Sequence, residues 1–243
     1  MKREHGLIVK PHDVLTILAG TKTQMRRPLG GPPLSAPAHA KVTRHHVNDG
    51  RTCAVFETPW PEVVKAAGWG RDPTGWTDET TGRACPWGAP GDRLWVRETW
   101  ANADCMYQGH ENDEPGVVAY RADKSAIQFD ASAPRTIPQW DLTSWNWDAL
   151  RWRSSTTMPR RFSRIQLEVT DVRCERLEAI SEADARAEGV SLEPCKHPDC
   201  DGNCAAKSYR GAFAALWNAT HVGGPTWGTE PFVWVVTFRR IGS

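Results

Sequence analysis

The chain has 243 residues, of which 40% are hydrophobic and 24% are charged, and this composition supports a packed core and excludes global disorder. Its formal net charge is +1, which gives no overall attraction to polyanions, so any surface for nucleic acid must be a local patch. No apolar run is long enough to cross a membrane, and the first residues lack the apolar core of a signal peptide. The seven cysteines, an odd number, fit reduced thiols, so we expect a cytoplasmic protein with no membrane partner.

The first ordered segment is expected near the start of the chain. Residues 6–10 have the composition of a short strand, and residues 12–20 have the apolar period of a helix that ends at Gly20. A connector rich in proline and glycine begins at Pro28 and predicts irregular structure.

The middle of the chain carries isolated signals between stretches of weak pattern. Residues 53–56 and 117–121 indicate strands, and residues 61–67 indicate a helix. Residues 91–100 begin with a Gly-Asp turn and then alternate apolar and polar side chains, as a half-buried strand does.

A long strand with a bend is expected next. Apolar side chains alternate from Ile165 to Val169, but the phase has shifted by Val172. This shift indicates a β-bulge at Thr170 and Asp171. Small barrels need such bends in order to close.

Two helices and a buried strand complete the pattern. Ser181 and Asp184 match a capping box that begins a short helix, which ends at Gly189. Residues 208–218 predict a second helix. Residues 231–240 predict a strand that is apolar on both faces, which is typical of a buried strand.

These elements indicate an α+β fold, because strands outnumber helices and lie far apart in the sequence. A small mixed β-barrel, closed or nearly closed, with flanking helices is the natural architecture. We expect one domain over residues 1–243, with long irregular insertions at about 28–90 and 101–150 and a compact loop at 191–207.

The first candidate site is the loop that follows the first helix. Lys22 and Thr23 lie there, followed closely by Arg26 and Arg27. A lysine at such a place can bind a phosphate or a base carbonyl, and a partly desolvated lysine can activate a neighbouring hydroxyl. The alternative is a solvated helix end whose lysine offsets the helix dipole.

The second candidate is an acid-free segment at residues 151–164. Its members of interest are Arg151, Trp152, Arg153, Arg160, Arg161 and Arg164. Guanidinium groups pair with phosphates and aromatic faces stack on bases, so the segment predicts a nucleic-acid surface, which Arg26 and Arg27 extend if the fold joins the two loops. The alternative is a surface loop whose arginines pair with acidic residues elsewhere.

The third candidate is a metal site in the compact loop. Cys195, His197, Cys200 and Cys204 can supply the four ligands of a tetrahedral zinc ion. A shell filled by protein ligands leaves no place for water, so the zinc is expected to be structural. The alternative is a loop with free thiols or one disulfide.

Four stretches together resemble the ASCH domain of the PUA-like superfamily, in the longer form that phages and prophages carry. They are ILAGTKTQMRR at 17–27, GDRLWVRETW at 91–100, SRIQLEVTDVRCERLEAISEADARAEGV at 163–190 and PFVWVVTFRR at 231–240. The resemblance implies a PUA-like β-barrel whose cleft binds RNA or modified bases. One ASCH family is an amidohydrolase that removes the acetyl group of N4-acetylcytidine with a lysine, a threonine and a glutamate.

The resemblance assigns these roles to particular residues. The lysine falls on Lys22 and the glutamate on Glu188, so we expect the two to meet across one pocket. The threonine falls on Met25, whose thioether cannot act as a nucleophile, and Thr23 is the neighbouring hydroxyl that keeps its place. A carboxylate in the last turn of a helix, as expected for Glu188, faces the negative end of the helix dipole.

The function that we expect is therefore binding of RNA, DNA or a modified nucleoside. The alternative is an amidohydrolase that acts on N4-acetylcytidine or a related N-acylated nucleoside, with Lys22, Thr23 and Glu188 as catalytic residues. A ribonuclease and a purely structural or interaction role are further possibilities.

Overall fold

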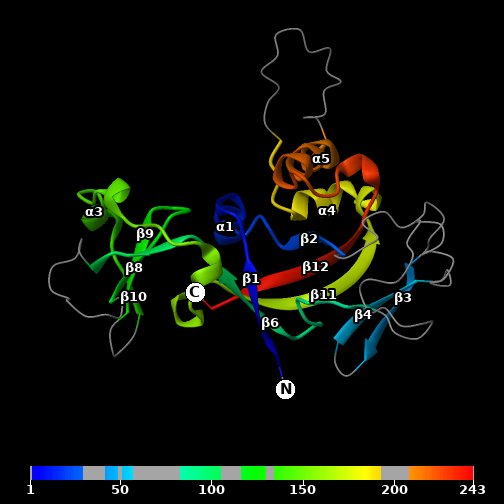
Figure 1. Cartoon of the computed structure of the whole chain (residues 1–243), viewed down its shortest axis with the longest axis horizontal. Helices are drawn as coiled ribbons and strands as arrows, with labels where there is room; N and C mark the ends of the chain where they lie inside the picture. Colours follow the sequence, from blue (N-terminus) through cyan, green and yellow to red (C-terminus); the bar gives the residue numbers. More distant parts are fainter. Residues whose placement is uncertain are drawn as a thin grey trace, which may run out of the picture.

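A five-stranded sheet forms the centre of the protein in the computed structural model (Figure 1). The structure describes residues 2–29, 42–48, 51–56, 83–104, 116–129, 134–192 and 208–242. The strand order is β1-β6-β11-β12-β2. The bounds are β1 (Glu4–Ile8), β2 (Gln24–Pro28), β6 (Arg93–Arg97), β11 (Gln166–Arg176) and β12 (Phe232–Ile241). β1 pairs with β6 in parallel, and the other neighbours are antiparallel.

Helices α1 (Pro11–Leu18), α4 (Glu182–Ala187) and α5 (Tyr209–Thr220) flank this sheet. The hydroxyl of Ser181 accepts a hydrogen bond from the backbone N–H of Asp184, so the predicted cap is confirmed. Gly20 follows α1 and Gly189 follows α4, with φ angles of 75° and 81°. Glycine enters this left-handed region without steric cost, which is why both helices end there. No described helix has the length and apolar composition needed to span a bilayer.

Strand β12 is buried on both faces, as its sequence predicts. Trp234 and Val236 pack into the main core with β1, β6 and α1. Val233 and Val235 belong to a separate cluster with Phe213 and other side chains of α4 and α5. The two helices at the top of Figure 1 therefore cover one face of β12, and the main core lies against the other.

Strand β11 contains the predicted bulge, since its register with β12 shifts between Val169 and Asp171. Both long strands bend strongly, as Figure 1 shows. Within the described residues, however, no ladder joins β1 to β2, so this curved sheet is open at its edges. The mixed α+β class is as expected, whereas a closed barrel does not form among these residues.

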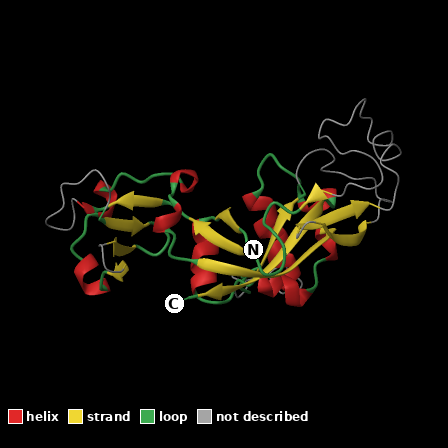
Figure 2. Ribbon diagram, turned by 90° about the horizontal axis from the view of Figure 1, so that it is seen from below, coloured by secondary structure: helices red, strands yellow, loops and turns green. Residues whose placement is uncertain are grey.

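A four-stranded antiparallel sheet lies to one side of the central sheet (Figure 2). Its strands stand in the order β10-β9-β8-β7, with bounds β7 (Trp100–Asn102), β8 (Val117–Tyr120), β9 (Ser125–Phe129) and β10 (Pro134–Thr136). Helix α3 (Gln139–Leu142) adds to a core of its own, which includes Ala119, Ala126, Leu142 and Trp145. The insertion expected at 101–150 is thus more regular than predicted, because such short, alanine-containing strands have a weak apolar period.

A three-stranded sheet contains β3 (Val42–Asn48), β4 (Arg51–Phe56) and β5 (Arg83–Ala84), in that order. The strand predicted at 53–56 falls within β4. The helix predicted at 61–67 and most of the connector after Pro28 lie outside the described residues. Short 3-10 helices occur at Trp147–Ala149, Ser155–Thr157, Arg160–Phe162, Leu177–Ala179 and Trp227–Thr229.

Candidate functional site

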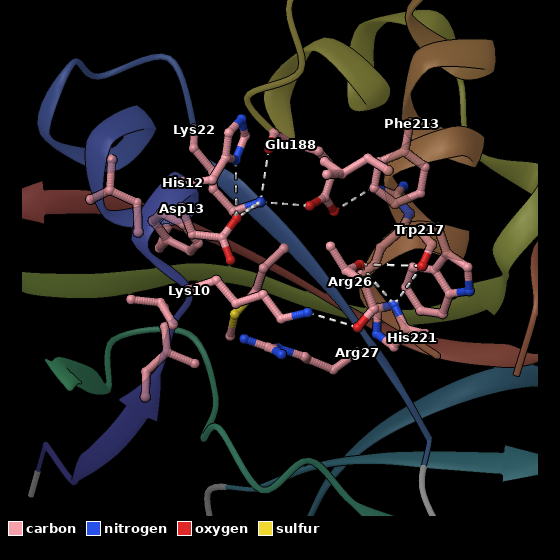
Figure 3. A pocket seen from close by; sticks show the side chains of 17 residues that line it. Lys10, His12, Asp13, Lys22, Arg26, Arg27, Glu188, Phe213, Trp217 and His221 are labelled. Atoms are coloured by element: carbon pink, nitrogen blue, oxygen red, sulfur yellow. Dashed lines mark hydrogen bonds and ion pairs between the residues drawn. The ribbon is translucent and has the colours of Figure 1, made fainter. Parts of the chain in front are cut away.

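Lys22 and Glu188 meet in the interior of the protein (Figure 3). The Lys22 ammonium donates to Glu188 Oε2 at 2.9 Å and to the Glu188 carbonyl oxygen at 2.8 Å. Their backbones also form an isolated antiparallel bridge. The side chains are only 7% and 3% exposed. The structure therefore brings together the two residues that the resemblance assigns to one site.

Two glycines allow this close approach. Beyond Gly20 the chain turns back on α1, and the N–H groups of Thr21 and Lys22 both donate to the Thr16 carbonyl oxygen. Gly189 ends α4 directly against this turn, where a Cβ atom would lie 2.9 Å from Lys22 Cβ and 3.0 Å from Thr16 Cβ. A larger residue at 189 would push the Lys22 turn away from Glu188.

Arg26 extends the charged network behind Glu188. Its Nη1 donates to Glu188 Oε1 at 3.0 Å, and its Nη2 donates to Glu175 Oε1 at 2.6 Å. The guanidinium is fully buried, and its Nε has no hydrogen-bond partner among the described residues. On the other side, Lys22 Nζ lies 3.4 Å from Asp13 Oδ1. Buried charges are tolerated only when paired, and each cation here has at least two carboxylates nearby.

A cavity of about 190 Å³ between α1, β2 and α5 is lined by Asp13, Lys22, Arg26 and Glu188 of this network. An aromatic and aliphatic wall faces the charged network, with members Leu7, Ile17, Met25, Phe213, Leu216, Trp217 and Phe238. A cavity of roughly 150 Å³ holds a benzene-sized ring. The cavity can thus take one small planar ring, with polar contacts on one side and apolar contacts on the other.

His221 lies in the same cavity, just after α5, and stacks on Trp217 with ring centroids 3.8 Å apart. Its Nδ1 lies 3.0 Å from the Trp217 carbonyl oxygen. A carbonyl only accepts, so Nδ1 carries the proton and Nε2 of the neutral ring is an acceptor. Nε2 has no hydrogen-bond partner among the described residues.

The surroundings of His221 favour its neutral form. Burial lowers the pKa of the imidazole, and the positive charges of Arg27 and Lys10 lower it further. The bond to the Trp217 carbonyl and the charge of Asp13 act in the opposite direction without cancelling the effect. His221 therefore presents an uncharged acceptor to the cavity near neutral pH.

Thr23 does not lie in the cavity. Its side chain is exposed, while its backbone N–H bonds to the Ala187 carbonyl. Met25, at the position of the family threonine, is buried and lines the cavity. The side-chain hydroxyl in the cavity lining comes from Thr220 instead. The structure thus does not support Thr23 as a nucleophile for a ligand bound here.

Arg164 forms hydrogen bonds and ion pairs with two carboxylates. Its guanidinium donates to both Glu98 oxygens at 2.8 Å and to Asp123 Oδ2 at 2.7 Å. Burial lowers the pKa of Arg164, but the bonds and charges of Glu98 and Asp123 more than offset this and leave it raised. Burial conversely raises the pKa of Glu98, although Arg164 acts against this. The predicted phosphate contact is replaced here by the alternative, an arginine paired with acids from elsewhere.

The other members of segment 151–164 lie in two settings. Arg160 pairs with Glu4 at 3.0 Å, and Arg161 lies over the Phe162 ring. A second concavity is lined by Arg151, Trp152, Arg153, Ser154 and Thr157. Arg26 and Arg27 line the first cavity, so they do not extend this surface. The acid-free segment therefore splits into paired arginines and an exposed arginine-tryptophan surface.

The predicted zinc ligands Cys195, His197, Cys200 and Cys204 lie outside the described residues. Within the part of the chain that the structure describes, no three His, Cys, Asp or Glu side chains are arranged to hold a metal ion.

Asp13 and His221 are site residues that sequence reasoning missed. Asp13 lies in the first turn of α1, where an acidic residue is usually explained by the helix dipole. His221 directly follows a helix whose Phe213 and Trp217 look like core residues. No local pattern marks either residue as part of a cavity.

Compared with known proteins, the chain matches no family model, no curated protein and no solved structure.

Proposed function

We propose that the chain is an ASCH-type, PUA-like protein that binds one base of a nucleotide or nucleoside in the cavity at Lys22 and Glu188. The observation that carries this proposal is the buried contact between these two side chains beside an aromatic wall. A nucleobase needs an aromatic surface for its ring and polar partners for its edge. Its ring stacks on aromatic side chains, and its edge carries hydrogen-bond donors and acceptors.

The polar side of the cavity offers both kinds of partner. Glu188 and Asp13 accept from an exocyclic amine, while Lys22 can donate to a ring carbonyl by loosening its 3.4 Å contact with Asp13. The mutual ion pair holds these groups in position before a ligand arrives, so little side-chain entropy is lost on binding. Phe213 and the His221 ring, which covers one face of Trp217, supply aromatic surface for the base, and stacking contributes about 1–3 kcal/mol per base.

Binding is favoured over catalysis because no hydroxyl stands in the family position. Met25 occupies it, and Thr23 faces outwards. An amidohydrolase of N4-acetylcytidine or a related nucleoside is the second candidate, since Lys22 and Glu188, two of its three catalytic residues, are in hydrogen-bond contact. Water activated by Glu188 would then have to replace the missing threonine.

The arginine-tryptophan surface of Arg151, Trp152 and Arg153 supports contact with a longer RNA or DNA ligand. Trp152 is stacked on Trp147 with an interplanar angle of 8°, and Arg153 lies over the Trp100 ring. Exposed cations held on aromatic faces are suited to phosphates and flanking bases. The structural zinc ion proposed for the loop at 191–207 would order the chain between α4 and α5.

The test is a binding titration with a panel of nucleosides, N4-acetylcytidine among them, and with short RNA and DNA. Glu188→Gln keeps the size of the side chain but removes its charge, and we expect it to weaken binding at least about tenfold. Thr23→Val serves as the matched control outside the cavity and should bind normally. Chromatography of the same mixtures detects any deacetylated product. Absence of binding across the whole panel would overturn the proposal.

A further inference from the structure

Two cations in the cavity lining have no carboxylate partner among the described residues. Lys10 Nζ donates to the Thr220 carbonyl oxygen at 2.7 Å, and Arg27 Nη2 donates to the Ile8 carbonyl oxygen at 2.8 Å. A backbone carbonyl carries no net charge, so neither contact neutralises its cation. The deeper cations Lys22 and Arg26 differ, because carboxylates surround both of them.

The excess positive charge is concentrated at one end of the cavity. Lys10 binds the last residue of α5, and His221 follows that residue directly. Lys10, Arg27 and His221 all line this cavity, and the charges of Arg27 and Lys10 lower the pKa of the His221 ring. In the view of Figure 3, Lys10, Arg27 and His221 lie below the Lys22–Glu188 contact.

A neutral ligand leaves these charges uncompensated. An anionic group would bind the free N–H groups of the Arg27 guanidinium and of the Lys10 ammonium, and charge-assisted bonds of this kind are stronger than neutral ones. Lys10 is exposed and Arg27 half-buried, so an anion can reach both from solvent. A cavity that admits one ring leaves the anionic part of a nucleotide at this end.

We propose that Lys10, Arg27 and His221 form a phosphate subsite, and that the ligand of the cavity is a nucleoside monophosphate. This inference rests on the proposed binding of a base at Lys22 and Glu188 and adds the chemical class of the ligand. His221 Nε2 accepts a hydrogen bond from a singly protonated phosphate, or takes up a proton when the dianion binds. The commitment for this cavity is to a mononucleotide, because it has room for a single ring; a longer RNA or DNA would be bound at the separate arginine-tryptophan surface.

The experiment compares cytidine, cytidine 5′-monophosphate, a cytidine dinucleotide and inorganic phosphate by calorimetric titration at low salt. We expect the monophosphate to bind at least about tenfold more tightly than the nucleoside. In the double variant Lys10→Gln/Arg27→Gln, the ratio of the affinities for monophosphate and nucleoside should fall to about one. Both cations that favour the monophosphate are then absent. Arg239→Gln, which removes an exposed arginine that is not part of the cavity lining, should keep the ratio.

A merely structural role of Lys10, as a cap for the end of α5, would weaken both ligands equally and leave the ratio unchanged. That outcome overturns the inference, as does equal binding of nucleoside and monophosphate by the unaltered protein. Either result leaves the proposed base binding intact. Tighter binding of the dinucleotide than of the monophosphate overturns the commitment to a mononucleotide.

The His221 ring gives an independent readout. Inorganic phosphate alone should raise the pKa of His221, followed by NMR, because a nearby anion favours the protonated ring. If phosphate produces this shift while no nucleoside or nucleotide binds, the subsite stands and the proposed function fails. If neither phosphate nor any nucleotide binds, both proposals fail.

Discussion

The Lys22 ammonium and the Glu188 carboxylate lie 2.9 Å apart, although 166 positions separate the two residues in the chain. The first comes from the turn after α1 and the second from the end of α4. Only the folded central sheet, with β2 beside β12, brings these two segments together. The contact therefore belongs to the tertiary structure, and its loss should affect both stability and binding.

Removal of the Glu188 carboxylate should lower the free energy of unfolding. Glu188→Ala leaves Lys22 and Arg26 buried with one partner fewer, and we expect the free energy of unfolding to fall by about 3–5 kcal/mol. The double variant Lys22→Met/Glu188→Gln should recover part of this loss, because the unpaired ammonium is also removed. Urea denaturation measures both. Lys2→Met, which breaks an exposed pair with Glu168, is the control and should change little.

Gly189 and Gly20 form a matched pair for a test of crowding at the site. Both have positive φ, so alanine at either position costs about 1–2 kcal/mol of backbone strain. At Gly20 no atom lies within 4 Å of an added Cβ, whereas at Gly189 the added atom meets Lys22 and Thr16. We expect Gly189→Ala to destabilise the fold more than Gly20→Ala and to weaken ligand binding as well. Equal effects of the two substitutions in thermal unfolding would show that a Cβ at position 189 does not crowd Lys22 and Thr16.

Arg164 and Arg151 should respond in opposite ways to the same substitution. Arg164→Met leaves Glu98, which is 3% exposed, without its bidentate partner, so we expect a loss of about 3–5 kcal/mol in unfolding free energy. Arg151→Met should leave the stability unchanged, because the side chain is exposed.

In binding to short RNA or DNA, Arg151 should matter and Arg164 should not. Arg151→Met should reduce the slope of log affinity against log salt by about one, as expected for one lost phosphate contact. A folded Arg164→Met protein measured at low temperature should keep the slope. An unchanged slope in Arg151→Met and Arg153→Met would remove this surface from the proposed interface.

His221 should make the stability depend on pH. Its pKa in the folded protein is below the usual 6.5, because burial and the cations Arg27 and Lys10 disfavour the charged ring. The unfolded chain therefore takes up this proton first as the pH falls. The contribution of His221 is fully present above pH 6.5 and is lost as the pH drops towards the folded-state pKa.

Denaturant titrations between pH 7.5 and 5.5 should thus show a smaller pH slope in His221→Gln than in the unaltered protein. Thr220→Val removes a neighbouring hydroxyl without a titrating group, and its slope should match that of the parent. Identical slopes in all three proteins would show that His221 is not the responsible group.

The purified protein should contain one zinc ion per chain if the loop at 191–207 binds metal as proposed. Cys200→Ser and Cys204→Ser should lose this ion, and Cys105→Ser, which lies far from the motif in the sequence, should retain it. Elemental analysis after dialysis against a weak chelator measures the content. Metal-free protein with an unchanged melting temperature would argue for the alternative, a loop with free thiols.

Local features of the fold could be predicted from the sequence. The cap at Ser181 and the glycine ends of α1 and α4 depend on neighbouring residues only, and so does the bulge near Asp171. The apolar side chains on both faces of β12 also predict its burial. In each case the physical cause lies within a few positions of its effect.

Contacts between distant segments could not be predicted in the same way. The segment around Arg164 contains no acid, yet Glu98 and Asp123 reach it from the strand region before β7 and the turn after β8. The cavity likewise combines Asp13 with His221, which no shared motif connects. Lys22 and Glu188 were exceptions, because a resemblance supplied the pairing that local pattern could not.

The position of β12 in the sheet has a consequence for biosynthesis. This strand follows all other described strands in the sequence, yet it lies between β11 and β2. A ribosome that has not reached residue 232 has already made Lys22 and Glu188, but the nascent chain lacks the strand that aligns their supports. The cavity is therefore absent throughout most of translation and forms only when the last strand inserts, so ligand cannot assist the earlier steps of folding.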